Sequence, residues 1–187
     1  MIGVLVSGSG TNLQALLDAR LPLVAVASNR PNVLALRRAD SAGVPTAVFE
    51  LDAFSARADR DLAMARWLES QGVELVVCAG YMHLLTPAFL ERFPGRVINV
   101  HPSLLPAFPG ANAIEDVLAA GARTTGATVH LVDDGVDTGF VIEQRVVEIN
   151  PGDTPETLRV RIQRVEHELL PAVTRRLFEE IRSEEAQ

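Results

Sequence analysis

Short apolar runs alternate with amphipathic segments along the first half of the chain. The apolar runs are rich in Val, Leu, Ile and Ala, whereas the segments between them repeat their apolar residues at helical spacing. The runs predict strands at residues 2–6, 23–27, 44–49, 75–79 and 96–100. The segments predict helices from about residue 13 and over residues 33–42, 57–71 and 87–93. Apolar strands that alternate with helices are typical of a parallel sheet covered on both faces.

The pattern changes in the second half of the chain. A helix is expected over residues 112–120, followed by two strand-like runs at residues 124–132 and 140–149. Only the loop DDGVDTG separates the two runs, so we expect them to join the sheet as an antiparallel addition. A long amphipathic helix over about residues 154–181 follows, with Pro171 as a candidate kink.

No linker, repeat or low-complexity segment interrupts this pattern. A length of 187 residues with 48% hydrophobic content suits one globular domain. We therefore predict a single α/β domain over residues 1–187, Rossmann-like, with a mostly parallel twisted sheet and helices on both faces.

Composition and charge exclude several classes of function. The net charge of -7 and the scattered arrangement of the 17 basic residues, all arginine, argue against a nucleic-acid partner. The absence of lysine excludes Schiff-base chemistry and a Walker lysine. No run of 18 apolar residues predicts a membrane span, and the N-terminus does not resemble a signal peptide. A single cysteine, Cys78, excludes an internal disulfide and a Cys-rich metal site, so we expect a cytoplasmic protein.

Candidate chemistry first emerges in the stretch VINVHPSLLPAFPG, where a strand ends. Asn99 and His101 are two residues apart, so they point to the same face of the strand. In an open sheet of this kind, ligands bind beyond the carboxyl ends of the strands. An amide donor beside an imidazole is suited to a developing oxyanion, although a histidine that merely ends a strand is the commoner case.

The glycine-rich turn SGSGTN follows the first strand and opens the first helix. It fits the dinucleotide fingerprint at Gly8 and Gly10 but fails at Leu13, and no acidic residue ends the second strand. Two interpretations remain open: a loop that binds a single phosphate, and a tight turn whose Thr or Asn caps the helix.

The loop between the last two predicted strands carries three carboxylates. Asp133, Asp134 and Asp137 are candidates to orient and charge His101. The rival interpretation is a metal site, but the spacing does not match an EF-hand. Of the other histidines, His130 in its strand is either a hydrogen-bonded core residue or an orienting group behind the site, and His167 reads as a solvated or capping residue.

Five segments, taken in order, resemble the folate-dependent phosphoribosylglycinamide formyltransferases over essentially the whole chain. They are VSGSGTNLQALLDA, VCAGYMHLLTPAFL, VINVHPSLLPAFPG, GATVHLVDDGVDTGFVI and RIQRVEHELLP. The resemblance implies direct transfer of the formyl group of 10-formyltetrahydrofolate, used as co-substrate without a metal, to the amine of glycinamide ribonucleotide. It implies catalytic roles for Asn99 as oxyanion donor, for protonated His101 as general acid, and for Asp137 as the group that keeps His101 charged. His130 would lie behind these groups.

The resemblance also implies two binding sites. Residues expected to bind the ribonucleotide are Gly10, Thr11, Asn12, Gln163 and Glu166. Residues expected to bind the folate are Arg57, Met82, His83, Leu84, Leu85, Asn99, Asp133 and Asp137. Phosphate binding would then fall mainly in residues 1–95, and folate binding and catalysis mainly in residues 80–187. The expected partners are small molecules, with the protein acting as a monomer or homodimer.

The chain departs from the family pattern at positions that bear on affinity more than on chemistry. His83 stands where relatives often have arginine, Asn112 replaces a histidine, and Phe140 replaces a common proline. The alternatives are 10-formyltetrahydrofolate hydrolase, another formyltransferase such as methionyl-tRNA formyltransferase, and a non-catalytic nucleotide-binding module. A non-catalytic nucleotide-binding module would not explain the presence of Asn99, His101 and Asp137.

Overall fold

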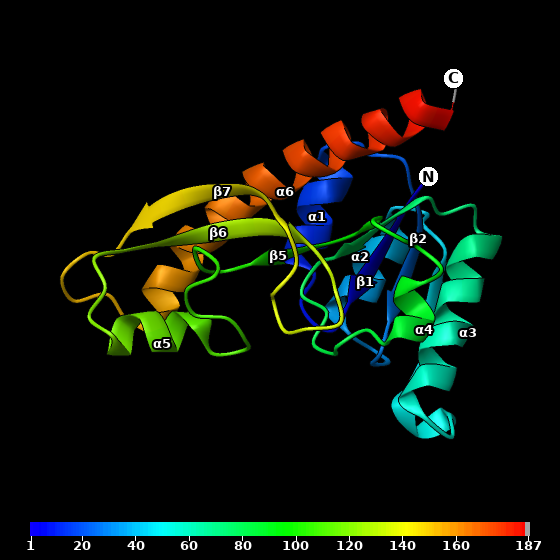
Figure 1. The fold of residues 1–187 in the computed structure, drawn as a ribbon, viewed down its shortest axis with the longest axis horizontal. Helices are drawn as coiled ribbons and strands as arrows, with labels where there is room; N and C mark the ends of the chain where they lie inside the picture. The colour runs from blue at the N-terminus through cyan, green and yellow to red at the C-terminus, as the bar shows by residue number, and fades with distance from the viewer. Residues whose placement is uncertain (186–187) are drawn as a thin grey trace.

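The computed structural model describes residues 1–185 and contains a seven-stranded sheet in the order β3-β2-β1-β4-β5-β6-β7 (Figure 1). The parallel strands are β1 (Ile2–Val6), β2 (Leu23–Ser28), β3 (Thr46–Val48), β4 (Leu75–Cys78) and β5 (Val97–His101). Two antiparallel strands extend the sheet beyond β5, namely β6 (Thr124–Leu131) and β7 (Val141–Glu148). The predicted α/β class, parallel sheet and antiparallel addition are confirmed.

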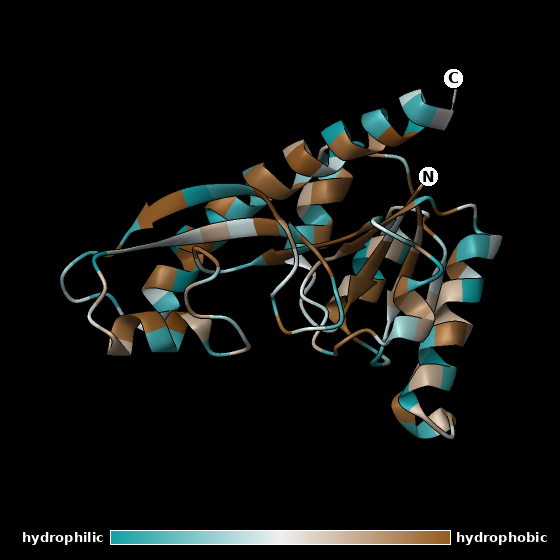
Figure 2. Ribbon diagram, in the orientation of Figure 1, coloured by the Kyte–Doolittle hydropathy of each residue, from teal (hydrophilic) through white to brown (hydrophobic). Residues whose placement is uncertain are grey.

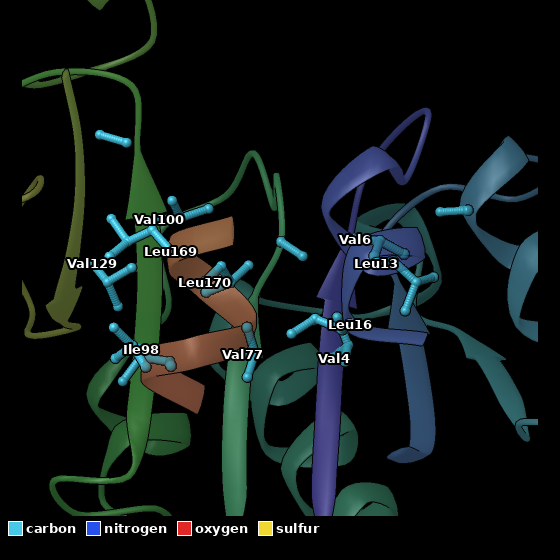
Figure 3. Close-up of a cluster of buried hydrophobic side chains, with 14 of the residues drawn as sticks. Val4, Val6, Leu13, Leu16, Val77, Ile98, Val100, Val129, Leu169 and Leu170 are labelled. Carbon is cyan, nitrogen blue, oxygen red and sulfur yellow. The ribbon is translucent and has the colours of Figure 1, made fainter. Parts of the chain in front are cut away.

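Helices cover both faces of the sheet. One face carries α1 (Thr11–Asp18), α2 (Leu34–Ser41), α5 (Ala113–Ala119) and the long α6 (Pro155–Glu185). The other face carries α3 (Arg57–Ser70) and the short α4 (Pro87–Leu90). In the larger core, Leu169 and Leu170 of α6 lie near Val77 and Ile98 of the central strands (Figure 3).

The central strands are apolar because both of their faces are buried. All five residues of β1 are buried, and β1 pairs in parallel with β2 on one side and β4 on the other. Figure 2 shows hydrophobic colours concentrated in these strands, whereas the last turns of α6 are largely hydrophilic. Within residues 1–185, no helix combines the length and hydropathy needed to cross a bilayer.

Three predicted helix ends differ from the structure by two residues or more, and one short element was not predicted. Helix α1 begins at Thr11 rather than near residue 13, because the turn closes at Gly10. Helix α4 ends at Leu90 rather than 93, where the chain continues in turns. Helix α6 continues through Pro171 and beyond residue 181 to Glu185. The 3₁₀ turn η1 (Leu51–Ala53) was not predicted.

The strand order sets the position of the site. From β1 the chain moves outward to β2 and β3, whereas from β4 it moves to the other side of β1, toward β5. Neighbouring strands β1 and β4 therefore flank a topological switch point, and the crevice outside their carboxyl ends is the expected binding region.

Candidate active site

Two adjoining cavities open at the carboxyl ends of the central strands. The first, of about 370 Å³, lies between the loop after β1 and helix α6. The second, of about 350 Å³, lies between the segment after β4, the end of β5 and the loop that joins β6 to β7. Residues that line both cavities are Gly80, Met82, Val100, Pro102 and Arg159. A molecule in the first cavity would therefore lie next to a molecule in the second.

The glycine loop forms one wall of the first cavity. Gly10 adopts a φ of 73°, and a Cβ atom there would lie 2.7 Å from the Cα of Ala35 on α2. The first intrahelical hydrogen bond of α1 runs from the Gln14 N–H to the Gly10 carbonyl, at 2.9 Å. Earlier N–H groups of the helix have no intrahelical acceptor and face the cavity end of α1, as an anion site requires.

The second interpretation of this turn, a Thr or Asn side-chain cap, is wrong. Gly10 is the capping residue, and α1 has no side-chain cap hydrogen bond. Thr11 and Asn12 instead occupy the first helical positions and line the cavity. Neither side chain caps the helix, and that of Asn12 is instead hydrogen bonded to Glu166.

Helix α6 supplies the opposite wall of the first cavity. Glu166 is buried and accepts a hydrogen bond from Asn12 Nδ2 at 3.0 Å, and half-buried Gln163 lies one turn earlier on the same wall. Burial raises the pKa of Glu166, although the Asn12 hydrogen bond and the charge of Arg159 act in the opposite direction. Asn12 Oδ1 is buried without a hydrogen-bond partner among the described residues. Helix α6 thus supplies a carboxylate and helix α1 an amide oxygen without a partner, and both groups accept from hydroxyl or amine donors.

The second cavity contains the residues of the predicted catalytic set. Asn99 and His101 come from β5, and Asp137 comes from the loop after β6. His101 Nδ1 lies 3.2 Å from Asp137 Oδ2. The structure therefore brings together three groups that two separate segments supply.

His130 lies directly opposite Asn99 in the antiparallel pairing of β5 and β6. Its Nδ1 lies 2.8 Å from the Leu131 carbonyl oxygen, which only accepts, so Nδ1 carries a hydrogen. In the neutral ring Nε2 is then an acceptor, and it lies 3.2 Å from Asn99 Nδ2. His130 consequently fixes which end of the Asn99 amide faces the site.

Asp137 is held in an unusual backbone conformation. Its φ is 53°, in the left-handed region that non-glycine residues seldom adopt, and its Oδ2 accepts a hydrogen bond from the Gly110 N–H at 2.8 Å. Burial alone would raise the pKa of this carboxyl. The His130 ring, the hydrogen bond from the Gly110 N–H and the charge on His101 together outweigh burial and lower the pKa below its usual value. The carboxylate is therefore charged beside His101.

Both ring nitrogens of His101 face acceptors. Nε2 lies 2.8 Å from the Phe108 carbonyl oxygen, and Nδ1 faces the Asp137 carboxylate. Only the imidazolium can donate from both nitrogens at once, so this arrangement stabilises the charged ring. To donate to a reacting atom, one of the two nitrogens must exchange its present acceptor.

Only some of the residues predicted to bind the folate lie together at the second cavity. Met82, His83, Leu84, Leu85 and Asp133 line the second cavity. Arg57 does not: it is exposed at the start of α3 and lines neither cavity. His83 is engaged within the protein, by Arg60 and Asn29.

Several residues at the site were not found from the sequence. Arg30 and Arg159 line the first cavity, and Arg60 and Asp61 form a fully buried ion pair behind the second. Arg60 and Asp61 lie in an amphipathic helix, where charged residues read as a solvated face. Within the described part of the chain, no group of three or more His, Cys, Asp or Glu side chains is arranged to hold a metal ion.

Comparison with known proteins gives a consistent result. A family model described as Formyl transferase matches residues 1–174. The phosphoribosylglycinamide formyltransferase of Haemophilus influenzae is 41% identical over 178 residues, covering 92% of this chain and 84% of that protein. The solved phosphoribosylglycinamide formyltransferase of Streptococcus pneumoniae has a TM-score of 0.91 at 41% identity, covering 95% of this chain and 98% of that one. The trifunctional purine biosynthetic protein adenosine-3 of Gallus gallus is 44% identical over 177 residues, and this chain spans 18% of its length.

Proposed function

The chain belongs to the formyl transferase family, among the phosphoribosylglycinamide formyltransferases, and from this premise we propose that it formylates glycinamide ribonucleotide with 10-formyltetrahydrofolate in purine synthesis. One observation carries the proposal. A cavity that begins at an anion-binding helix terminus adjoins a second cavity that holds Asn99, His101 and Asp137. A phosphorylated amine in the first cavity and a formyl donor in the second would meet at their shared wall.

The proposed reaction is a direct transfer. The substrate amine attacks the formyl carbon, a tetrahedral intermediate forms, and the bond from that carbon to the folate nitrogen breaks. The amine loses a proton, and the departing folate nitrogen gains one. The transfer forms no covalent bond to the protein, so the mechanism needs no activated nucleophile.

Asn99 is proposed to stabilise the oxyanion. Its amide nitrogen carries two hydrogens, of which His130 Nε2 accepts one at 3.2 Å. The nearest acceptor for the other is Asp137 Oδ1 at 3.5 Å, too long for a strong hydrogen bond. This hydrogen is therefore available to an oxygen that becomes negative during the reaction.

His101 is proposed as the general acid, with Asp137 keeping it charged. The observed distance of 3.2 Å between Nδ1 and the carboxylate supports this pairing. His101 would release the Phe108 carbonyl or the carboxylate in order to reach the reacting atoms, and water would carry the exchanged proton.

Binding roles follow from the walls of the cavities. Gly10, Thr11 and Asn12 would hold the phosphate, and Gln163 and Glu166 would accept from the ribose or glycinamide part. The folate would be held by the segment from Met82 to Leu85 and by Asp133. Arg57 would contact the folate only from outside the cavity.

We also propose a monomer or homodimer, because residues of a single chain line both cavities. A cytoplasmic location is proposed because the single cysteine suits a reducing compartment. We further propose a division into a phosphate-binding part, mainly residues 1–95, and a folate-binding part, mainly residues 80–187. The C-terminal helix contributes Gln163 and Glu166 to the first cavity.

The decisive experiment mixes the protein with a 10-formyl folate analogue in the presence and absence of glycinamide ribonucleotide. Formyl loss from the folate should require the ribonucleotide and should match formation of the formylated product. Loss at the same rate without the ribonucleotide would favour a hydrolase instead. His101→Ala should remain folded by circular dichroism and lose most turnover.

A further inference from the structure

Helix α2 holds the glycine loop from the side opposite the first cavity. The Ala35 N–H donates to the Gly8 carbonyl oxygen at 3.1 Å, and Arg38 Nε donates to the Ser9 carbonyl oxygen at 3.0 Å. Ser9 and Gly10 line the first cavity, whereas Ala35 and Arg38 do not. Two successive carbonyl groups of the loop therefore point toward α2 and away from the region where a ligand would bind.

The direction of the Ser9 carbonyl fixes the direction of the Gly10 N–H. The two groups belong to one planar trans peptide, in which the C=O and N–H bonds point in opposite directions. Because the carbonyl oxygen lies on Arg38, the Gly10 N–H points away from α2, on the side of the first cavity. Within residues 1–185 this N–H has no acceptor in the protein. It is therefore a donor that a phosphate oxygen can use.

The Arg38 guanidinium is itself held in place by α1. Arg38 Nη1 donates to Gln14 Oε1 at 2.9 Å, and Gln14 Nε2 donates to Asp18 Oδ1 at 2.9 Å. The directions are consistent, because a guanidinium can only donate and a carboxylate only accepts, so the amide oxygen of Gln14 faces Arg38 and its nitrogen faces Asp18. Arg38 thus connects α2, the glycine loop and α1.

The charge of Arg38 adds to the effect of its position. Within the described part of the chain, Arg38 hydrogen bonds only to uncharged acceptors, the Ser9 carbonyl and the Gln14 amide. A charged donor makes a stronger hydrogen bond than a neutral one, and hydrogen bonds that share a polar group polarise each other. Donation from Arg38 to the Ser9 carbonyl therefore makes the Gly10 N–H a better donor to an anion.

Resting on the function proposed above, we propose that Arg38 is a positioning residue of the phosphate site. It orients and polarises the Ser9–Gly10 peptide so that the Gly10 N–H donates to a phosphate oxygen, although the Arg38 side chain stays outside the first cavity. Gln14 supports this role by fixing the guanidinium. If Arg38 only fastened α2 to α1, its removal would lower stability and leave phosphate binding by the folded protein unchanged.

The first test follows the backbone amide signals of ¹⁵N-labelled protein by NMR during a titration with ribose 5-phosphate. In wild type, saturation should move the amide hydrogens of Gly10, Thr11 and Asn12 downfield, because each donates to the phosphate. In Arg38→Met, which keeps an unbranched side chain without donors, the shift at Gly10 should be largely lost, and the shifts at the other two positions should remain. An unchanged shift at Gly10, or equal loss at all three positions, would overturn the proposal.

The second test measures binding by calorimetry. Arg38→Met should weaken binding of ribose 5-phosphate by about tenfold, since a hydrogen bond to a charged group is weakened, while affinity for the folate analogue stays within about twofold. Arg37→Met is the matched control, because Arg37 is the next residue on α2, is exposed and lines neither cavity. It removes the same charge from the same helix and should leave both affinities within about twofold. Equal loss in the two variants would assign the effect to net charge and contradict the positioning role.

Two further variants separate positioning from loss of structure. Arg38→Lys keeps a charged donor for the Ser9 carbonyl, so it should unfold in urea as wild type does and bind ribose 5-phosphate more tightly than Arg38→Met. Gln14→Ala leaves Arg38 in place without its second acceptor. Added to Arg38→Met, it should weaken binding no further, because Gln14 acts through Arg38. Failure of lysine to restore affinity, or independent losses in the double variant, would count against the assignment.

These outcomes are separate from the outcome of the formyl-transfer assay. Wild-type protein that binds ribose 5-phosphate as described but transfers no formyl group would contradict the proposed function and leave the role of Arg38 intact. Formyl transfer to glycinamide ribonucleotide by wild type, together with normal phosphate-ester binding by Arg38→Met, would contradict the role of Arg38 alone. Wild-type protein that does not bind the phosphate ester would overturn that role whatever the assay gives.

Discussion

Asn12 of the glycine loop donates from Nδ2 to the buried carboxylate of Glu166 on α6, at 3.0 Å. This contact joins residues 154 positions apart and links the two walls of the first cavity. Burial is the main cause of the raised pKa of Glu166. The Glu166 carboxyl group therefore holds its proton more tightly in the folded protein than in the unfolded chain. Protonation of Glu166 stabilises the folded state, and this contribution is complete below the ordinary carboxyl pKa and is lost as pH rises through the folded-state pKa.

Glu166→Gln should separate stability from binding. The glutamine oxygen can still accept from Asn12, but no charge is buried, so the variant should be more stable than wild type at about pH 8 and nearly equal at about pH 4. Binding of glycinamide ribonucleotide should weaken about tenfold, because a neutral acceptor replaces a charged one. Thermal unfolding across pH and calorimetry measure the two effects. Glu168→Gln, an exposed neighbour on α6, is the control and should change neither. A variant that is less stable than wild type at high pH would contradict the assignment.

Asp137→Asn should reduce turnover by about a hundredfold or more, because the charge that favours the His101 imidazolium is removed. The introduced asparagine side chain keeps an oxygen for the Gly110 N–H, so the fold should persist. The lowered pKa of Asp137 has the opposite sign to that of Glu166. Its contribution to stability is present above the ordinary carboxyl pKa and is lost as pH falls through the folded-state pKa.

Urea unfolding from neutral to acidic pH checks this sign. Wild type should lose more stability than Asp137→Asn as the pH falls below about 4. Asp134→Asn lies in the same loop, is exposed and lines neither cavity, so it should behave as wild type in both measurements. Parallel acid unfolding of wild type and Asp137→Asn would show that the carboxylate is not stabilised in the folded protein.

Much of the fold could be predicted from the sequence because the information is local. The run Ile2–Val6 is apolar throughout, and the structure buries all of it in a central strand. The i, i+2 spacing of Asn99 and His101 places both side chains on one face of β5 in the same way. The observed strand ends differ from the predicted ones by a residue or two, because hydrogen bonding to a neighbouring strand, not composition, decides where a strand stops.

Contacts between segments could not be predicted in this way. The meeting of Asp137 with His101 depends on the register of β5 with β6, which sets Asn99 opposite His130 and so places the following loop. The burial of Arg60 could not be predicted for a similar reason. An arginine on a helix is normally solvated, and only the packing of α3 against the segment after β4 buries it beside Asp61 and His83.

Gly10→Ala should destabilise the protein by at least about 2 kcal/mol. The residue has a φ of 73°, and an added Cβ would lie 2.7 Å from both the Cα and Cβ of Ala35. The strain must displace α1 from α2, so ribonucleotide binding should weaken as well. Gly8→Ala is the matched control for stability, because a Cβ there meets no atom within 4 Å. Equal unfolding midpoints in urea for the two variants would show that the close approach of the helices is not rigid.

Cys78 should be almost inert in the folded protein. It lies in β4 with 5% of its surface exposed, and burial raises the pKa of its thiol from 9.0 to about 12. Because the thiolate is the reactive form, this shift alone should slow reaction with a disulfide reagent at neutral pH by roughly a thousandfold relative to the unfolded chain. Absorbance of the released thiol, followed with and without denaturing urea, gives the ratio of rates, and Cys78→Ala supplies the blank. Since Cys78 also lines the second cavity, a folate analogue should slow the residual reaction further. A native rate close to the unfolded rate would mean that the end of β4 opens to solvent much more readily than its packing implies.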